Sequence, residues 1–354
     1  MSESSPMNAG DGTYSYTKNS TVQRDAASGV NDAIREALME NLDVEKLLGG
    51  STTFTIADLG CSVGPNTVSA VESLIETVAH KCRRQGLDPE SLEFQVLFND
   101  QIGNDFNTLF ASLPRPRSYV AAAVPGSFYG RLFPSSSVHV AYSSFAVHWS
   151  SKVPEELHRR DSPAWNAGRI HYSDSSPEAV VKAYSDQFQR DMESFLGARA
   201  QEIAPGGAIV VVVPGVPEGV VTYSGGVAFS FLEFILAEMV REGVIEQEQV
   251  DSFNVPNVYP SVKDLRRVVE RNGCFEIVKM EFRDVGVGEV EPENVIMLIR
   301  AIFEGCMANH FGTVVVNNLF VRAMRHKLQF AAILNLAGIE GTVSQIMAVL
   351  IKRN

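Results

Sequence analysis

The chain has 354 residues, of which 45% are apolar and 20% are charged, so it is long enough to bury one large core or two modest ones. Its 42 acidic side chains outnumber the 30 basic ones and give a formal net charge of −12, which argues against nucleic acid as a partner because polyphosphates bind basic surfaces. The longest uninterrupted apolar runs, such as Ala208 to Val213, are far shorter than the roughly 20 residues that cross a bilayer, so we expect no membrane partner.

The amino terminus and the cysteines indicate the compartment. Residues Met1 to Pro6 lack the charged and apolar regions of a secretory signal. The four cysteines are far apart and form no CxxC pair, which disfavours a disulfide framework or a cysteine zinc site. We therefore expect reduced thiols and a cytoplasmic protein.

The predicted elements begin with a polar arm. Residues 1–20 are small and polar, a composition that is typical of an arm rather than of a core element. From Val22 to Leu48 apolar residues recur at intervals of three and four, which predicts a helix that the glycines at 49 and 50 end. A β-branched strand over 54–59, a glycine turn and a helix over 66–84 follow.

The order of strand, turn and helix repeats downstream. Further strands are expected over residues 92–98, 119–124, 138–143, 208–213, 275–282 and 344–351, with a helix over 105–113. Continuous apolar strands separated by helices predict a parallel sheet that is covered on both faces. Two extra helical stretches, 229–248 and 293–329, are interpreted as a cap over the carboxyl ends of the strands, where ligands of open α/β folds bind. Ordinary covering helices are the alternative.

The turn from Asp58 to Gly64 is the first motif that points to chemistry. Its glycines let the backbone approach a ligand closely, and the next helix presents free amide groups at its start. The spacing matches neither the dinucleotide fingerprint nor a phosphate loop. The carboxylate of Asp58 would repel phosphate and suits a cationic nucleoside such as S-adenosylmethionine. A plain tight turn is the alternative.

A second acidic residue strengthens this hypothesis. Asp100 ends the next predicted strand, where a carboxylate can accept hydrogen bonds from both ribose hydroxyls. The alternative is an aspartate that caps a turn at Gly103. The two acidic strand ends together favour S-adenosylmethionine as the cofactor.

Six motifs, in order along nearly the whole chain, resemble those of the plant SABATH methyltransferases of secondary metabolism. They lie at residues 7–23, 57–67 (ADLGCSVGPNT), 98–107 (FNDQIGNDFN), 124–129 (VPGSFY), 143–149 (SSFAVHW) and 251–256 (DSFNVP). The resemblance implies one methyltransferase domain over residues 1–354: an α/β, Rossmann-like class I sheet with helices on both faces. It also implies an α-helical cap from residues of about 215–262 and 293–330, an amino-terminal arm or lid over 1–25, and a homodimer.

The resemblance further implies a reaction and residue roles. The methyl group of S-adenosylmethionine passes to the carboxylate of a small molecule, giving a methyl ester. The positions that match donor contacts, together with Asp58, are Tyr16, Cys61, Asn66, Asp100, Gln101, Ser127 and Phe128. Gln23 and Trp149 match the pair that holds the acceptor carboxylate, and Tyr142, Phe145 and His148 match their neighbours. Some relatives carry a divalent-ion site, which corresponds here to a Mg²⁺ site at Asn166, Asp251, Phe253 (through its carbonyl) and Asn254.

These residue types suit the reaction. A carboxylic acid with a pKa of about 4 is already ionised at neutral pH, so the attacking oxygen needs no general base. The neutral donors of Gln23 and Trp149 can orient a carboxylate without quenching its charge as an arginine would. The arm that carries Tyr16 and Gln23 is expected to act as a lid that excludes water.

Other interpretations remain open at this level. Methylation of a ring nitrogen in a xanthine-type base, as in caffeine biosynthesis, must remove a proton, and His148 would then be the base. Trp149 could instead be ordinary core packing, Gln23 a solvated helix residue, and the whole chain a binding module without turnover.

The acceptor is not identified by the motifs. The family often has tyrosine where this chain has Phe145, and leucine where it has Ser150, and residues 214–226 lack the expected serine-rich loop with a tryptophan. An apolar bias nevertheless favours an aromatic or terpenoid acid. That bias rests on Phe145, Phe229, Phe231, Phe234 and Ile235.

Overall fold

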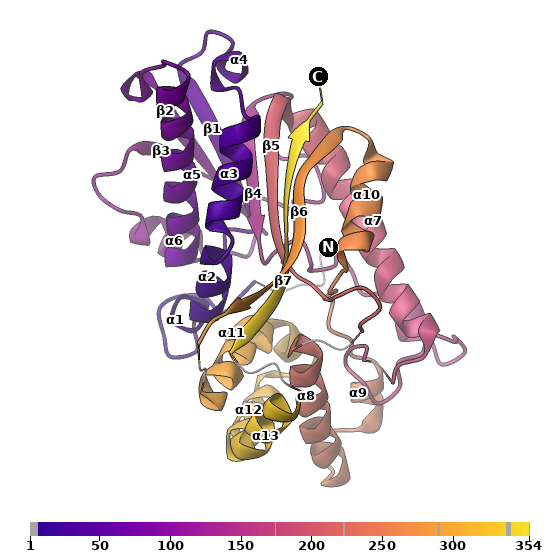
Figure 1. The fold of residues 1–354 in the computed structure, drawn as a ribbon. Helices are drawn as coiled ribbons and strands as arrows, with labels where there is room; N and C mark the ends of the chain where they lie inside the picture. Colours follow the sequence, from indigo (N-terminus) through magenta and orange to yellow (C-terminus); the bar gives the residue numbers. More distant parts are fainter. Residues whose placement is uncertain (1–5, 174, 222–223, 289–290, 338–340, 354) are drawn as a thin grey trace.

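The computed structural model describes residues 6–173, 175–221, 224–288, 291–337 and 341–353. Within these residues the chain forms a seven-stranded sheet with the strand order β3-β2-β1-β4-β5-β7-β6 (Figure 1). The strands are β1 (Thr53–Leu59), β2 (Glu93–Asp100), β3 (Tyr119–Pro125), β4 (Val138–Ser144), β5 (Ile203–Pro214), β6 (Phe275–Gly286) and β7 (Thr342–Lys352). The predicted α/β class is confirmed, and every predicted strand is present, although β5 begins five residues earlier and β6 ends four residues later than predicted.

The direction of one strand differs from the expectation of a parallel sheet. Strands β1 to β5 pair in parallel, but β7 runs antiparallel to both β5 and β6. The sheet is therefore mixed. Apolar periodicity reports that a strand is buried on both faces and carries no information on its direction, so the sequence pattern could not reveal the reversal.

The run of apolar residues in β5 shows why the sheet is covered on both sides. Ala208, Val210 and Val212 face one core, which includes residues of α3 (Asn31–Asn41) and α5 (Pro65–Arg84). Residues 209, 211 and 213 face a second core, which includes residues of α7 (Glu178–Glu202) and α10 (Val262–Asn272). Figure 1 shows the two helical layers on either side of the sheet. The short elements are α6 (Phe106–Ser112), η1 (Pro89–Ser91) and η2 (Glu155–Leu157).

The helix predicted from Val22 to Leu48 is divided. The chain forms α1 (Tyr16–Asn19), α2 (Thr21–Ser28), α3 and α4 (Val44–Leu48). At Gly29 a Cβ atom would lie 2.5 Å from Cγ1 of Val285, so only glycine lets β6 approach the end of α2. Asp43 caps α4 by accepting a hydrogen bond from the Lys46 amide at 3.2 Å. The division thus follows from a tertiary contact and a local cap.

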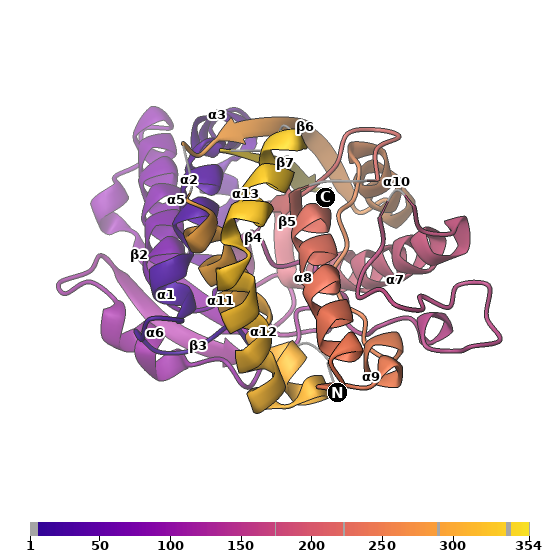
Figure 2. The ribbon, with the colours of Figure 1, turned by 90° about the horizontal axis from the view of Figure 1, so that it is seen from below.

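A third core joins the helices beyond the sheet. It contains residues of α8 (Ser224–Arg241), α11 (Pro292–Phe311), α12 (Thr313–Arg325) and α13 (Lys327–Leu336), which lie beside one another in Figure 2. The predicted stretch 229–248 splits into α8 and α9 (Gln247–Asp251), and 293–329 splits into three helices. The glycines at 243 and 312 have φ values of 70° and 84°, which end α8 and α11. These helices lie below the carboxyl ends of the parallel strands (Figure 1).

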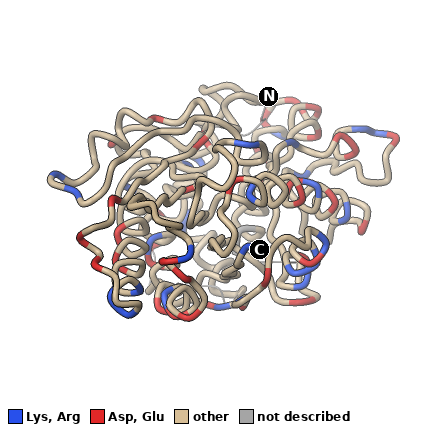
Figure 3. The backbone as a smooth tube through the Cα atoms, turned by 90° about the horizontal axis from the view of Figure 1, so that it is seen from above, with Lys and Arg blue, Asp and Glu red and all other residues tan. Residues whose placement is uncertain are grey.

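The charged side chains lie around the periphery. Figure 3 shows acidic and basic residues interspersed there, while the centre of the molecule holds few of either. Among the described helices, none combines the length and apolar character that a bilayer span requires. Residues 1–5 of the expected arm and 222–223 of the first expected cap segment lie outside the described residues.

Candidate active site

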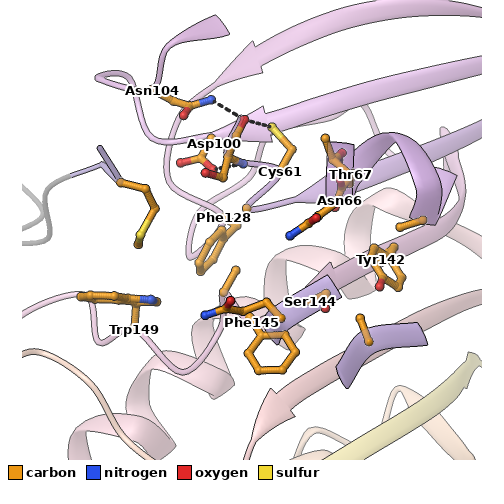
Figure 4. Close-up of a pocket in the computed structure, with 18 of the residues that line it drawn as sticks. Cys61, Asn66, Thr67, Asp100, Asn104, Phe128, Tyr142, Ser144, Phe145 and Trp149 are labelled. Carbon is orange, nitrogen blue, oxygen red and sulfur yellow. Dashed lines mark hydrogen bonds between the residues drawn. The ribbon is translucent and has the colours of Figure 1, made fainter. Parts of the chain in front are cut away.

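A cleft of about 150 Å³ opens at the carboxyl ends of β1, β2 and β4, and we call it the donor cleft. It brings together every residue that the motifs matched to donor contacts, from four separate parts of the chain. Figure 4 shows several of them around the cavity. These residues are Tyr16, Asp58, Cys61, Asn66, Asp100, Gln101, Ser127 and Phe128.

The turn after β1 owes its course to glycine. Gly60 has a φ of 83°, and a Cβ atom there would lie 2.2 Å from the Cβ of Ala146. Gly64 has a φ of 100° and precedes α5, whose first-turn residues Asn66 and Thr67 line the cleft. Ser62 also has a positive φ, 50°, and its carbonyl accepts hydrogen bonds from the Asn104 amide at 3.0 Å and the Cys61 thiol at 3.6 Å (Figure 4). The turn is therefore held in one shape before any ligand enters.

The two acidic residues at the strand ends are both desolvated. The carboxylate of Asp100 accepts hydrogen bonds from the backbone amides of Ser62 and Gln101, each at 2.7 Å, and burial raises its pKa to about 6. Burial raises the pKa of Asp58 to about 7, although the Thr67 hydroxyl donates a hydrogen bond to it. Each carboxylate retains lone pairs for a ligand hydroxyl or cation.

The amino-terminal arm closes over this cleft. Asn66 on α5 donates hydrogen bonds to the Ser20 carbonyl at 3.1 Å and the Ser20 hydroxyl at 3.0 Å. At the other end of the arm, the Asn8 amide nitrogen donates to the Ala301 carbonyl at 2.9 Å. The guanidinium of Arg300 lies 3.7 Å from the ring centroid of Tyr14. Tyr16, which lies between these anchors, is therefore held against the cavity from both sides, and Gln23 follows shortly after the anchor at Ser20.

A second cavity of about 210 Å³ adjoins the first, and we call it the acceptor chamber. Both cavities are lined by Tyr16, Gln23, Phe145 and Trp149. The indole of Trp149 packs 5.3 Å from the ring of Phe303. The Oε1 atom of Gln23 is buried without a hydrogen-bond partner among the described residues. An amide whose oxygen is unpaired thus lies where the two cavities meet, and its NH2 group is the part that can donate to a carboxylate.

His148 lines the chamber but not the cleft. Its Nδ1 atom is buried and has no hydrogen-bond partner in the described part of the chain. Burial lowers the pKa of His148 to about 3, so its imidazole is neutral near pH 7. The backbone around it is fixed, since its carbonyl accepts a hydrogen bond from the Val258 amide at 2.9 Å.

Several side chains lie elsewhere than the sequence analysis placed them. Tyr142 lines the donor cleft and not the chamber, and burial raises its pKa to about 12. Phe231 and Ile235 are buried in the cap core, and Phe234 packs against His326 on the outside of α8. The apolar wall instead comes mostly from α11 and α13, which the sequence analysis did not assign to it. Its residues there are Val295, Leu298, Ile299, Ile302, Phe303, Phe330 and Leu334.

Of the residues expected to bind a divalent ion, Asn166 and Asn254 are in direct contact, whereas Asp251 binds a neighbouring backbone amide. The amide of Asn166 donates a hydrogen bond to Oδ1 of Asn254 at 2.7 Å, and its own Oδ1 is buried without a partner among the described residues. Asp251 accepts a hydrogen bond from the Gly168 amide at 2.8 Å. Amide, carboxylate and carbonyl oxygens, the last from Phe253, are the donors that Mg²⁺ prefers, so the set fits in kind. Within the described residues, no three His, Cys, Asp or Glu side chains gather as a metal cluster.

Comparison with known proteins gives a consistent result. The profile of the family described as SAM dependent carboxyl methyltransferase matches residues 2–353. Loganic acid O-methyltransferase of Catharanthus roseus is 44% identical over 325 residues, 90% of this chain and 86% of the relative. Farnesoic acid carboxyl-O-methyltransferase of Arabidopsis thaliana is 40% identical and covers 88% and 89% of the two chains. A 7-methylxanthine methyltransferase of Camellia ptilophylla is 35% identical, over 89% of each.

A solved structure agrees with the fold. The structure described as loganic acid methyltransferase with SAH superposes with a TM-score of 0.91 at 39% sequence identity and covers 99% of both chains. The whole described architecture, including the cap helices, therefore has a close counterpart of known three-dimensional structure.

Proposed function

The chain belongs to the family of SAM-dependent carboxyl methyltransferases, and we propose that its two cavities divide one reaction between them. The protein is a SAM-dependent carboxyl O-methyltransferase that converts a small-molecule carboxylic acid to its methyl ester. In our proposal the donor cleft holds S-adenosylmethionine and the acceptor chamber holds the acid. The single observation that carries this division is that a cleft lined by two carboxylates and a chamber without charged lining residues meet at Gln23 and Trp149.

The donor cleft supplies contacts for each part of the donor. We assign the ribose hydroxyls to Asp100, whose carboxylate lies at the end of β2. Asp58 lies at the end of β1 and, when ionised, suits the cationic part of the molecule. The ring of Phe128 lines the same cavity as the amide of Gln101 and the hydroxyl of Ser127 and offers an apolar face to the adenine. Tyr16 closes the cleft from the arm.

The chamber positions the acceptor without neutralising it. Among the described residues that line the chamber none carries a charge near pH 7, because His148 is neutral there. The carboxylate of the acid therefore meets only the sulfonium of the donor as an opposite charge. We assign the orientation of the carboxylate to the amide of Gln23 and the indole N–H of Trp149. In a dry cavity the remaining requirement is alignment of the attacking oxygen with the methyl carbon at about 3 Å.

The shape and lining of the chamber define the class of acid. Apolar cavities of about 150 Å³ admit a benzene-sized molecule, so a chamber of about 210 Å³ admits a larger apolar body. Side chains of α11 and α13 form much of the wall and offer no hydrogen bonds. We therefore propose an acid with an aromatic or terpenoid body. A sugar-bearing acid would leave its hydroxyl groups unpaired against this wall.

A panel of acids with labelled S-adenosylmethionine tests the assignment. Aromatic and acyclic terpenoid acids of ten to fifteen carbons should be methylated, and their glycosides should not. The product must hydrolyse as a methyl ester in mild alkali. Turnover of the glycosides alone would contradict the proposed acceptor class, whereas turnover of no acid would contradict the proposed acceptor chemistry.

N-methylation is the second candidate, because a 7-methylxanthine methyltransferase is among the relatives. It requires a base, and the low pKa of His148 makes that residue a weak one. At saturating donor, ester formation should proceed at a constant rate between pH 7 and 9. A rate that depends on a group titrating in this range, together with turnover of xanthines, would favour the nitrogen acceptor.

We also propose that Asn166, Asp251, the Phe253 carbonyl and Asn254 hold Mg²⁺. A bound Mg²⁺ would supply a structural crosslink there. The loop that follows supports the acceptor site, since the Ser150 amide donates to the Pro256 carbonyl at 2.9 Å. Chelation by EDTA should lower the thermal midpoint, and a midpoint that is the same with EDTA and with added Mg²⁺ would remove the ion from the proposal.

A homodimer and a cytoplasmic location are further proposals. Three apolar side chains on the cap helices support a covered face: Val314, Leu328 and Leu336 are 84%, 79% and 90% exposed in the single chain. The four cysteines form no disulfide bond with one another, which supports a reducing compartment. Sedimentation equilibrium tests the dimer, and a monomer at micromolar concentration would exclude it.

A further inference from the structure

Helix α7 carries a buried polar face that the reaction described above does not use. Gln187, Asp191, Arg199 and Glu202 are 2%, 5%, 0% and 0% exposed. Burying charged groups is costly unless their hydrogen bonds are satisfied, and such groups are strongly destabilising when one partner is lost. These buried side chains form hydrogen bonds with two loops of the active site.

The first loop is the one that follows β3 and lines the donor cleft. Arg199 donates hydrogen bonds to the carbonyls of Phe128 at 2.7 Å and Gly130 at 2.9 Å, and it pairs with Glu202 at 2.6 Å. Glu202 in turn accepts a hydrogen bond from the Phe133 amide at 3.0 Å. Because both loop carbonyls and a loop amide bind one buried ion pair, the backbone that carries Phe128 is rigid.

The second loop follows β4 and carries Trp149. Asp191 accepts hydrogen bonds from the Ser151 amide at 2.9 Å and the Ser151 hydroxyl at 2.6 Å. Gln187 donates to the same Asp191 carboxylate at 2.8 Å. Helix α7 thus binds the loop after β3, which we call the donor loop, through residues at the carboxyl end of the helix. It binds the loop after β4, which we call the acceptor loop, through residues in the middle of the helix.

Tyr129 joins the two anchored loops directly. It belongs to the donor loop, where both Tyr129 and its neighbour Phe128 line the cleft, and its hydroxyl donates a hydrogen bond to the carbonyl of Trp149. The Val147 carbonyl lies 3.4 Å from the same hydroxyl. The ring of Tyr129 packs edge-on against Phe128, with centroids 4.8 Å apart. A displacement of one loop is therefore transmitted to the residue that we assign to the acceptor carboxylate.

We propose that Tyr129 is a positioning residue: its hydroxyl holds the Trp149 backbone at a fixed distance from the donor loop, with α7 as the common support. This inference rests on the proposed roles of Trp149 and the donor cleft. In-line transfer demands that acceptor oxygen and methyl carbon be aligned, and each is bound by a different loop. Among the described residues, the hydroxyl of Tyr129 forms a side-chain hydrogen bond that joins the two loops directly, without a residue of α7 between them.

Tyr129→Phe removes this hydroxyl and keeps the ring. We expect kcat to fall about tenfold or more, because small misplacements of reacting groups are costly, while affinity for S-adenosylhomocysteine stays within about twofold. Tyr119→Phe is the matched control, since it removes a buried tyrosine hydroxyl that has no hydrogen-bond partner among the described residues and lines neither cavity. The control should keep native kcat.

A spectroscopic readout requires no acceptor. The chain has two tryptophans, so Trp165→Phe leaves Trp149 as the only one. In that background, time-resolved fluorescence anisotropy should show larger fast motions of Trp149 in Tyr129→Phe. Ser151→Ala, which removes one of the two hydrogen bonds from Ser151 to Asp191, should also increase them, and Tyr119→Phe should not.

The outcomes separate a positioning role from other roles. Unchanged kcat together with unchanged Trp149 motion in Tyr129→Phe would overturn the proposal. An equal loss of kcat and of S-adenosylhomocysteine affinity would also overturn it, since Tyr129 would then act as a donor contact. If the native protein methylates no acid, the proposed acceptor chemistry fails, but the anisotropy and the donor affinity still decide the role of Tyr129.

Discussion

The donor cleft and the acceptor chamber are built in opposite ways. The cleft is lined by the ends of the strands and the turns after them, together with residues of α2 and α5, and its two carboxylates are held by backbone amides or a neighbouring hydroxyl. The chamber is formed largely by apolar side chains of helices that lie far apart in the sequence. One half of the site is therefore fixed by local backbone geometry, and the other by the packing of the cap.

This difference has a functional consequence. A turn that glycines and backbone hydrogen bonds hold in one shape suits a ligand that every member of a family shares. A wall of interchangeable apolar side chains can change volume with few substitutions. The difference accounts for relatives that share about 40% of their residues with this chain yet are named for acids as different as loganic and farnesoic acid.

Among the substitutions, Asp100→Ala should have the largest effect, and it should weaken donor binding without altering the acceptor chamber. It removes the carboxylate that we assign to two ribose hydroxyls, and hydrogen bonds to charged groups contribute about 1.5–3 kcal/mol each, so donor affinity should fall at least about 100-fold. Isothermal titration with S-adenosylhomocysteine measures this. Asp105→Ala is the control, because Asp105 caps α6 and does not line the cleft. An unchanged affinity in Asp100→Ala would refute the ribose contact.

Gln23→Ala should weaken acceptor binding without weakening donor binding. Loss of one hydrogen bond to a carboxylate predicts a rise of about 20-fold in the acceptor KM, with donor affinity unchanged. Steady-state kinetics and titration with S-adenosylhomocysteine separate the two quantities. Asp25→Ala, on the same helix with an exposed side chain, serves as the control. A native KM in Gln23→Ala would count against the proposed carboxylate contact.

The pH dependence of donor affinity provides a further test, with a smaller expected effect than the two substitutions. The folded-state pKa of Asp100 is raised to about 6, so this carboxylate is protonated below that pH and cannot then accept both ribose hydrogens. Affinity for S-adenosylhomocysteine should be about tenfold or more weaker at pH 5 than at pH 8, where both Asp100 and Asp58 are ionised. Asp100→Asn should remove the part of this dependence that titrates near pH 6, and any dependence that remains near pH 7 then belongs to Asp58, whose pKa is about 7. A native affinity that is constant from pH 5 to 8 would contradict the assignment.

The same raised pKa has a consequence for stability with the opposite sign. An aspartate whose pKa is higher in the folded than in the unfolded state binds more protons when folded. Its contribution to the free energy of unfolding therefore decreases as pH rises from about 4 to 6. Acid weakens donor binding through Asp100 even while Asp100 itself favours the folded state there.

The sequence by itself determined the sheet and the donor side. Strands such as β1 and β5 are buried on both faces, and Gly60 and Gly64 lie in the turn between β1 and α5. These features are local, because a residue and the neighbours that determine its conformation lie within a few positions of each other. The residues that the family resemblance matched to donor contacts lie together in the donor cleft, because the parallel strands bring their carboxyl ends to one edge of the sheet.

The tertiary structure decided the rest. Only packing shows that β7 runs against β5, that α11 rather than Phe231 and Ile235 lines the chamber, and that Tyr129 reaches Trp149. Helix α7 was also not predictable from apolar spacing, because its buried face mixes Arg199 and Glu202 with apolar residues and so weakens the helical pattern. Each of these features depends on contacts between residues that are distant along the chain, and the spacing of residue types within one segment does not specify which distant segment it will meet.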